Sequence, residues 1–113
     1  MSVTQRPNAR LANLDAMAKT AVMSSAVRDN RALSRFELDV NGVTAFANYQ
    51  LGDGVITISH TETPAAARGQ GIASRLVAGA LELARARGRK VIPRCPFVRA
   101  YMAKHPDVSD LLA

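Results

Sequence analysis

A change of hydrophobic period along residues 55–93 constrains the fold of this chain more than any other feature. The β-branched stretch VITISHTE (55–62) predicts a strand, and the stretch IASRLVAGALELARARG (72–88) predicts a long amphipathic helix. The apolar stripe of that helix consists of Ile72, Leu76, Val77, Ala80, Leu81, Leu83 and Ala84. A short strand, KVIP (90–93), follows. Because strands joined by a crossover helix normally run parallel, this segment predicts a parallel pair.

The stretch before residue 55 has a period of two. RFELDV (35–40) alternates apolar and acidic residues, NG (41–42) suits a two-residue hairpin turn, and VTAFANYQ (43–50) returns as a strand. A second turn, LGDG (51–54), leads into the strand over 55–62, and FVRAYMAKH (97–105) predicts a short helix that Pro106 ends. We therefore expect an α/β (α+β) fold with a mixed sheet. Its order is an antiparallel three-strand meander, the long helix, a parallel strand and the short helix.

Composition predicts one globular domain. The 113 residues are 48% hydrophobic and carry a net charge of +6, which favours anionic partners of several kinds. One cysteine and two histidines make a structural metal site improbable, so we expect no metal. No apolar run approaches the roughly 18 residues that a membrane span needs, and we expect a cytoplasmic protein without a membrane partner.

The N-terminal part differs from the rest. Apolar residues between Leu11 and Val22 recur at spacings of three and four, which predicts a helix. We expect residues 1–33 to form a helical or disordered extension and residues 34–113 to form the domain. The basic residues within 1–28 also suit an organelle-targeting presequence.

The connection ARGQG (67–71) has two interpretations. A helix start exposes up to four N–H groups without internal partners, and glycines there let an anion approach them closely. The segment would then be a phosphate cradle to which Arg68 and Gln70 add donors. Alternatively, it is a plain strand-to-helix turn. It is neither a Walker loop nor a complete dinucleotide fingerprint.

The context of this loop resembles the GNAT acetyltransferases. Their Gln/Arg-x-x-Gly-x-Gly/Ala pattern is met by Arg68, Gly71 and Ala73, and KVIPRCPFVRAYMAKHPD (90–107) is similar to the end of a short, single-domain, YjdJ-like group among them. The likeness covers about residues 28–112. The chain departs from a full GNAT domain because it lacks the two helices after the first strand, and because Thr63 replaces an apolar residue before Pro64.

The resemblance implies an acetyl-CoA-dependent N-acetyltransferase that acts on an amine of a small molecule or a protein. The diphosphate would lie on the loop residues Arg68, Gly69, Gln70, Gly71, Ile72 and Ala73. The pantetheine arm would pair with backbone around Thr61 to Thr63, where the family splays two strands apart.

Four residues are candidates for the chemistry. His60 and Glu62 share one face of a strand and would act as base, or they are a surface pair. Tyr101 stands where many GNAT enzymes carry the proton donor for the leaving thiolate, or it merely packs on the cofactor. Cys95 lies between Arg94 and Arg99, whose charges favour a thiolate that accepts the acetyl group, or it is a small buried hydrophobe.

Two other functions compete with this interpretation. One is a GNAT-like protein that binds CoA without catalysis, since fold alone does not guarantee activity. The other is a basic nucleic-acid-binding module, which is disfavoured because aromatic residues are few and the arginines are dispersed except for RARGRK (85–90). The sequence gives no indication of an oligomeric state.

Overall fold

The computed structural model describes residues 27–113. The helix expected over residues 11–22 lies outside this range. The elements in chain order are β1 (Val27–Asn30), β2 (Arg35–Val40), β3 (Val43–Gly52), β4 (Val55–Glu62), the 3-10 turn η2 (Ala65–Ala67), α3 (Ile72–Ala86), β5 (Lys90–Pro93), α4 (Pro96–Lys104) and η3 (Pro106–Leu111).

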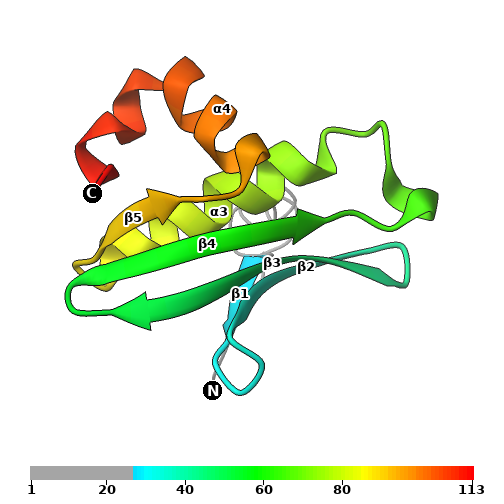
Figure 1. Cartoon of the computed structure of the whole chain (residues 1–113). Helices are drawn as coiled ribbons and strands as arrows, with labels where there is room; N and C mark the ends of the chain where they lie inside the picture. The colour runs from blue at the N-terminus through cyan, green and yellow to red at the C-terminus, as the bar shows by residue number, and fades with distance from the viewer. Residues whose placement is uncertain (1–26) are drawn as a thin grey trace, which may run out of the picture.

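The sheet is mixed, as the hydrophobic periods predict. Its strands lie in the order β1-β2-β3-β4-β5; the first three pairs are antiparallel and β4 pairs with β5 in parallel (Figure 1). Asn41 and Gly42 form the turn between β2 and β3 with φ values of 50° and 84°, which is the geometry expected of an Asn-Gly hairpin. The predicted meander and parallel pair are therefore confirmed.

The sheet has one strand more than the sequence predicts. Residues Val27–Asn30, within the expected N-terminal extension, pair antiparallel with β2. The stretch VRDN has one apolar residue, Val27, so it shows no period of two. Ion pairs across the strands fix β1 instead: Arg28 lies 2.6 Å from Glu37 and 2.6 Å from Asp39. The meander thus has four strands.

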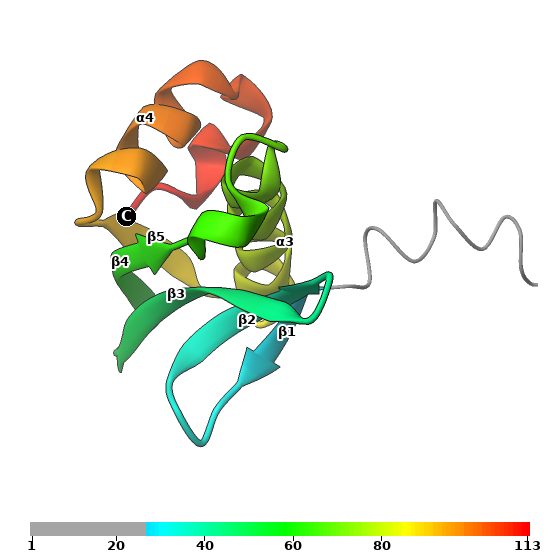
Figure 2. The same ribbon diagram turned by 90° about the vertical axis from the view of Figure 1, so that its right-hand side faces the viewer.

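One face of the sheet is covered by helices. Figure 1 shows α3 running behind the strands, and the view turned by 90° places α3, α4 and η3 on the same side of the sheet (Figure 2). The stripe predicted for the helix is buried there except for Leu83, which is partly buried. The largest fully buried side chains are Phe36, Leu38, Ile56, Ile58, Leu76, Leu81, Val77, Val91 and Val98.

The other face of the sheet carries a buried acid. Glu37 is 3% exposed and receives hydrogen bonds from Arg28, Arg35 and Asn30. Arg35 also lies over the ring of Phe46, 4.5 Å from its centroid. These contacts satisfy the carboxylate, which explains how a charged residue is tolerated in the middle of a sheet face.

Candidate active site

Strands β4 and β5 separate at their carboxyl ends. The last residue pair of their parallel ladder is Ile58 with Pro93. Beyond it, the N–H groups of Arg94 and Cys95 both donate to the carbonyl of Ile58 at 3.0 Å, and the chain then turns into α4. No described strand therefore pairs with the β5-facing edge of residues 59–62. The separation implied by the family resemblance is present.

A β-bulge in β4 decides which residues face the helices. Tyr49 of β3 is opposite Ile58, but the next residue, Asn48, is opposite His60, so Ser59 is the extra residue. Side chains of paired residues point to the same side of a sheet. Thr61 is opposite the buried Ala47 and therefore faces the helices.

The bulge turns the side chains of His60 and Glu62 to the opposite face of the sheet. His60 is opposite Asn48 and Glu62 is opposite Phe46, so both lie on the face that carries Glu37. They form a pair at 3.1 Å between His60 Nε2 and Glu62 Oε1, with side chains 56% and 53% exposed. Their predicted pairing on one face is confirmed; their role as base stays a prediction.

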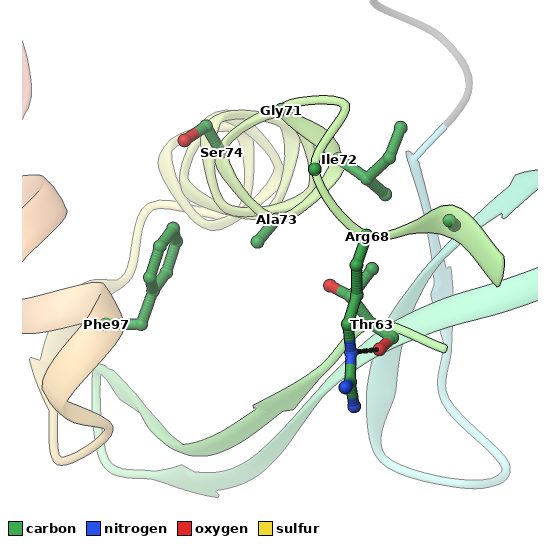
Figure 3. A pocket seen from close by; sticks show the side chains of 9 residues that line it. Thr63, Arg68, Gly71, Ile72, Ala73, Ser74 and Phe97 are labelled. Carbon is green, nitrogen blue, oxygen red and sulfur yellow. Dashed lines mark hydrogen bonds between the residues drawn. The ribbon is translucent and has the colours of Figure 1, made fainter. Parts of the chain in front are cut away.

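A hollow of about 220 Å³ lies at the start of α3. In Figure 3, Thr63 and Arg68 flank it on one side and Phe97, from the start of α4, flanks it on the other. Its full lining is Thr63, Ala67, Arg68, Gly69, Gly71, Ile72, Ala73, Ser74 and Phe97. The predicted loop residues are thus gathered at one site, except Gln70, which does not line it.

The backbone donors at this hollow meet no acceptor in the described part of the chain. Helix α3 begins after Gly71, and its first internal bond runs from the N–H of Arg75 to the carbonyl of Gly71 at 3.1 Å. Within residues 27–113, no acceptor meets the N–H groups from Gly69 to Ser74. Exposed amides at the positive end of a helix are suited to a phosphate group.

Arg68 adds positive charge beside these amides. Its Nε donates to the carbonyl of Thr63 at 2.9 Å, which ties the end of β4 to the loop. This bond leaves the two terminal nitrogens of the guanidinium available to an anion. A Cβ atom at Gly71 would meet no other atom within 4 Å, so the glycine leaves open space in front of the amides.

Cys95 is buried where β4 and α4 approach each other. The residue is 5% exposed, and its Sγ lies 3.6 Å from Thr61 Oγ1. Burial raises the pKa of the thiol, but the N–H of Val98, the hydroxyl of Thr61 and the N–H groups of Phe97 and Thr61 together outweigh it, so the pKa lies below its ordinary value. None of the α4 N–H contacts has the geometry of a full capping hydrogen bond.

The cause of this lowered pKa differs from the sequence-based expectation. We expected the charges of Arg94 and Arg99 to favour the thiolate. Neither charge is among the main causes of the lowered pKa; Arg99 Nη2 instead donates to the carbonyl of Arg94 at 3.1 Å. The donors are backbone amides and a hydroxyl, because Cys95 is the residue that immediately precedes α4.

Tyr101 lies one helical turn beyond Phe97 and does not line the hollow. Its ring stacks on His105 with centroids 3.8 Å apart. Burial, followed by the charges of Asp107 and Glu82, raises the pKa of its hydroxyl. The hydroxyl therefore stays protonated at neutral pH, as a proton donor must, but its predicted role is not tested by these contacts.

Three lining residues were not predicted from the sequence. Ala67 and Ser74 adjoin the predicted loop. Phe97 comes from a different element and is 39% exposed, although it is a large apolar residue. Its exposure follows from its position on the rim of the hollow. The only sequence signal for Phe97 as a site residue was its position after Cys95-Pro96, at the start of a helix.

Among residues 27–113, no three His, Cys, Asp or Glu side chains are grouped so as to hold a metal ion. None of the helices described is long and apolar enough to cross a membrane.

Comparisons with known proteins identify the family of this chain. The chain is similar to the NMR solution structure of a GCN5-like protein from Staphylococcus aureus whose name proposes N-acetyltransferase activity. The TM-score is 0.59 at 26% identity, over 77% of this chain and 86% of that chain. A comparison with curated proteins finds no match. The family described as GCN5-related N-acetyl-transferase matches residues 35–111. Because this match covers most of the chain, the protein belongs to the GCN5-related N-acetyltransferase family.

Proposed function

We propose that this protein binds acetyl-CoA at the hollow before α3 and transfers the acetyl group to an amine. The observation that carries the proposal is the run of N–H groups from Gly69 to Ser74 without an acceptor in the described residues, next to the guanidinium of Arg68. A diphosphate matches these donors in charge and in hydrogen-bonding capacity. The hollow is open in front of Gly71, as an approaching phosphate requires.

The strand separation supports an extended substrate arm. The β5-facing edge of residues 59–62 has no strand partner among the described residues, and Thr63, which lines the hollow, directly follows the end of that strand. An amide-containing chain such as pantetheine can satisfy such an edge by backbone-like hydrogen bonds. This arm would lead from the diphosphate toward Cys95 and Thr61.

Acetyl-CoA supplies an acetyl group activated as a thioester. The Cys95 thiolate attacks the carbonyl carbon, a new carbon–sulfur bond forms, and the CoA thiolate leaves and takes up a proton. The amine then attacks the acetyl-cysteine, the bond to Cys95 breaks, and the proton of the amine passes to a base. The lowered pKa of the thiol supports this route over direct attack by the amine.

The acceptor amine is proposed to reach the gap from the face that carries His60 and Glu62. Both side chains are exposed, adjacent and on the opposite side of β4 from Thr61. One accepts the proton that the amine loses, directly or through water. The acceptor is a small molecule or a protein amine; we propose no nucleic-acid partner.

Calorimetric titration of the full chain with CoA tests the binding step. Release of free thiol from acetyl-CoA, measured against lysine-containing proteins, polyamines and amino acids, tests the transfer. We expect saturable binding and acceptor-dependent thiol release. Binding without release to any acceptor would leave a CoA-binding protein that is not an enzyme. Absence of binding at saturating CoA would overturn the whole proposal, and a salt-sensitive gel shift would then favour a nucleic-acid partner.

A further inference from the structure

Thr61 has a contact that the sequence does not reveal. The family resemblance gives residues 61–63 a backbone role only. The bulge at Ser59 instead turns the side chain of Thr61 toward the helices, and its Oγ1 lies 3.6 Å from Cys95 Sγ across 34 residues of sequence. Without the bulge, the alternation along β4 would point Thr61 to the opposite face, away from the sulfur.

Several donors converge on this sulfur. The hydroxyl and N–H of Thr61 come from β4, and the N–H groups of Phe97 and Val98 come from the first turn of α4. Cys95 is 5% exposed as a residue, so water contributes little to the solvation of its side chain. Among these donors, the hydroxyl is the one that a conservative substitution can remove without changing the backbone.

We propose that Thr61 is a positioning residue for Cys95: its hydroxyl donates a hydrogen bond to the sulfur and holds it at the gap between β4 and β5. This inference rests on the proposed function only for the role of Cys95 as the nucleophile in acetyl transfer. With a neutral thiol, either group can donate. Once the thiol has lost its proton to solvent, only the hydroxyl can donate, and the bond becomes charge-assisted and stronger.

The test compares three variants of the full chain: Thr61→Val, Thr61→Ser and Thr57→Val. Valine removes the hydroxyl at nearly constant shape, and serine keeps it. Thr57 is the matched control, because it lies on the same strand, before the bulge, opposite Gln50, and points away from the helices. Thermal denaturation first establishes that each variant folds.

The readout is the ultraviolet absorbance of the thiolate as a function of pH. The chain has one cysteine and two tyrosines, so the part of the signal that Cys95→Ser loses belongs to Cys95. We expect Thr61→Val to raise the apparent thiol pKa and to lower the thiolate fraction at neutral pH by roughly three- to tenfold. Thr61→Ser and Thr57→Val should titrate like the parent protein.

Coincident titration curves for Thr61→Val and the parent would overturn the inference. If Thr61→Val does not fold, the comparison of Thr61→Ala with Thr61→Ser decides by the same readout. The titration uses no acetyl-CoA, so its result is independent of whether the protein proves to be an acetyltransferase. A normal titration of Thr61→Val with lost transfer would assign Thr61 to substrate binding instead.

Discussion

Val27 of β1 packs directly against the backbone of α3 at Gly79. A Cβ atom at position 79 would lie only 2.6 Å from the Cβ of Val27, which is closer than non-bonded carbons approach. Gly79 therefore lets β1 approach the helix closely, and Val27 of β1 is part of the core although the sequence does not predict this strand. Tyr49 and Arg87 hold the same strand, through hydrogen bonds of 2.5 and 2.7 Å to Asp29.

Replacing Gly79 with alanine should destabilise the protein. Overpacking costs about 1–3 kcal/mol, and the better helix propensity of alanine returns about 1 kcal/mol. We therefore expect a net loss of up to about 2 kcal/mol in urea denaturation. The double variant Gly79→Ala/Val27→Ala should recover part of this loss, because the second change removes the clash. Strictly additive changes in the free energy of unfolding would show that Val27 of β1 does not pack against position 79.

Replacing Gly71 with alanine should weaken CoA binding. Gly71 has a φ of +70°, so alanine strains the backbone by roughly 1–2 kcal/mol, and its methyl group projects into the space in front of the amides. Gly54 is the matched control: its φ is +73°, it too has no atom within 4 Å of an added Cβ, and it lies in the β3–β4 turn. We expect both variants to lose similar stability by thermal denaturation.

Only Gly71→Ala should lower the CoA affinity in calorimetric titration. Equal affinities of the two variants would place the diphosphate elsewhere.

Replacing Cys95 should separate the two chemical routes. If the acetyl group passes through the sulfur, Cys95→Ala and Cys95→Ser lower the transfer rate by roughly two orders of magnitude or more, while CoA still binds. Intact-mass spectrometry of the parent protein mixed with acetyl-CoA, without an acceptor, should detect one acetyl group on Cys95. Full transfer by both variants would make the residue structural and favour direct attack by the amine.

His60 and Glu62 should matter to catalysis and little to stability. Both side chains are more than half exposed, and exposed substitutions usually change stability by less than about 0.5 kcal/mol. Removal of the base should lower kcat by roughly 100-fold or more in His60→Gln or Glu62→Gln. Glu82→Gln, on the exposed face of α3, serves as control for the loss of one carboxylate. Unchanged kcat in both variants would make them a surface pair.

Glu37 should make the protein sensitive to acid. Burial raises the pKa of Glu37, but hydrogen bonds from Arg35 and Asn30 and the charges of Arg28 and Arg35 outweigh it, so the pKa lies below its ordinary value. A carboxylate with a lowered pKa stabilises the fold above its unfolded pKa. This contribution is lost as the pH falls through the folded pKa.

Urea denaturation at about pH 7 and at about pH 4 measures this effect. We expect the free energy of unfolding of Glu37→Gln to change less between these two pH values than that of the parent protein. Asp110→Asn is the control. The pKa of Asp110 is lowered by a hydrogen bond from Arg85, but both side chains of this pair are exposed, so the change should be smaller. An equal acid sensitivity of the parent and Glu37→Gln would contradict the prediction.

The order of elements from β2 to α4 and the glycine turn before α3 follow from the sequence. The reason is that both depend on local signals. Period two along 35–40 and period 3.6 along 72–86 specify backbone geometry residue by residue, and Gly71 marks a backbone with positive φ at a helix start. Such signals need no knowledge of what the segment contacts.

Tertiary structure alone decided which side chains meet. β1 carries a single apolar residue, and it is a strand because Val27 reaches Gly79 and Arg28 reaches Glu37 and Asp39. The extra residue at Ser59 depends on how β3 registers against β4, and it places Thr61 beside Cys95 while His60 and Glu62 face the other way. These relations join residues far apart in the chain, and a side chain's direction in a strand reverses with a one-residue shift of register.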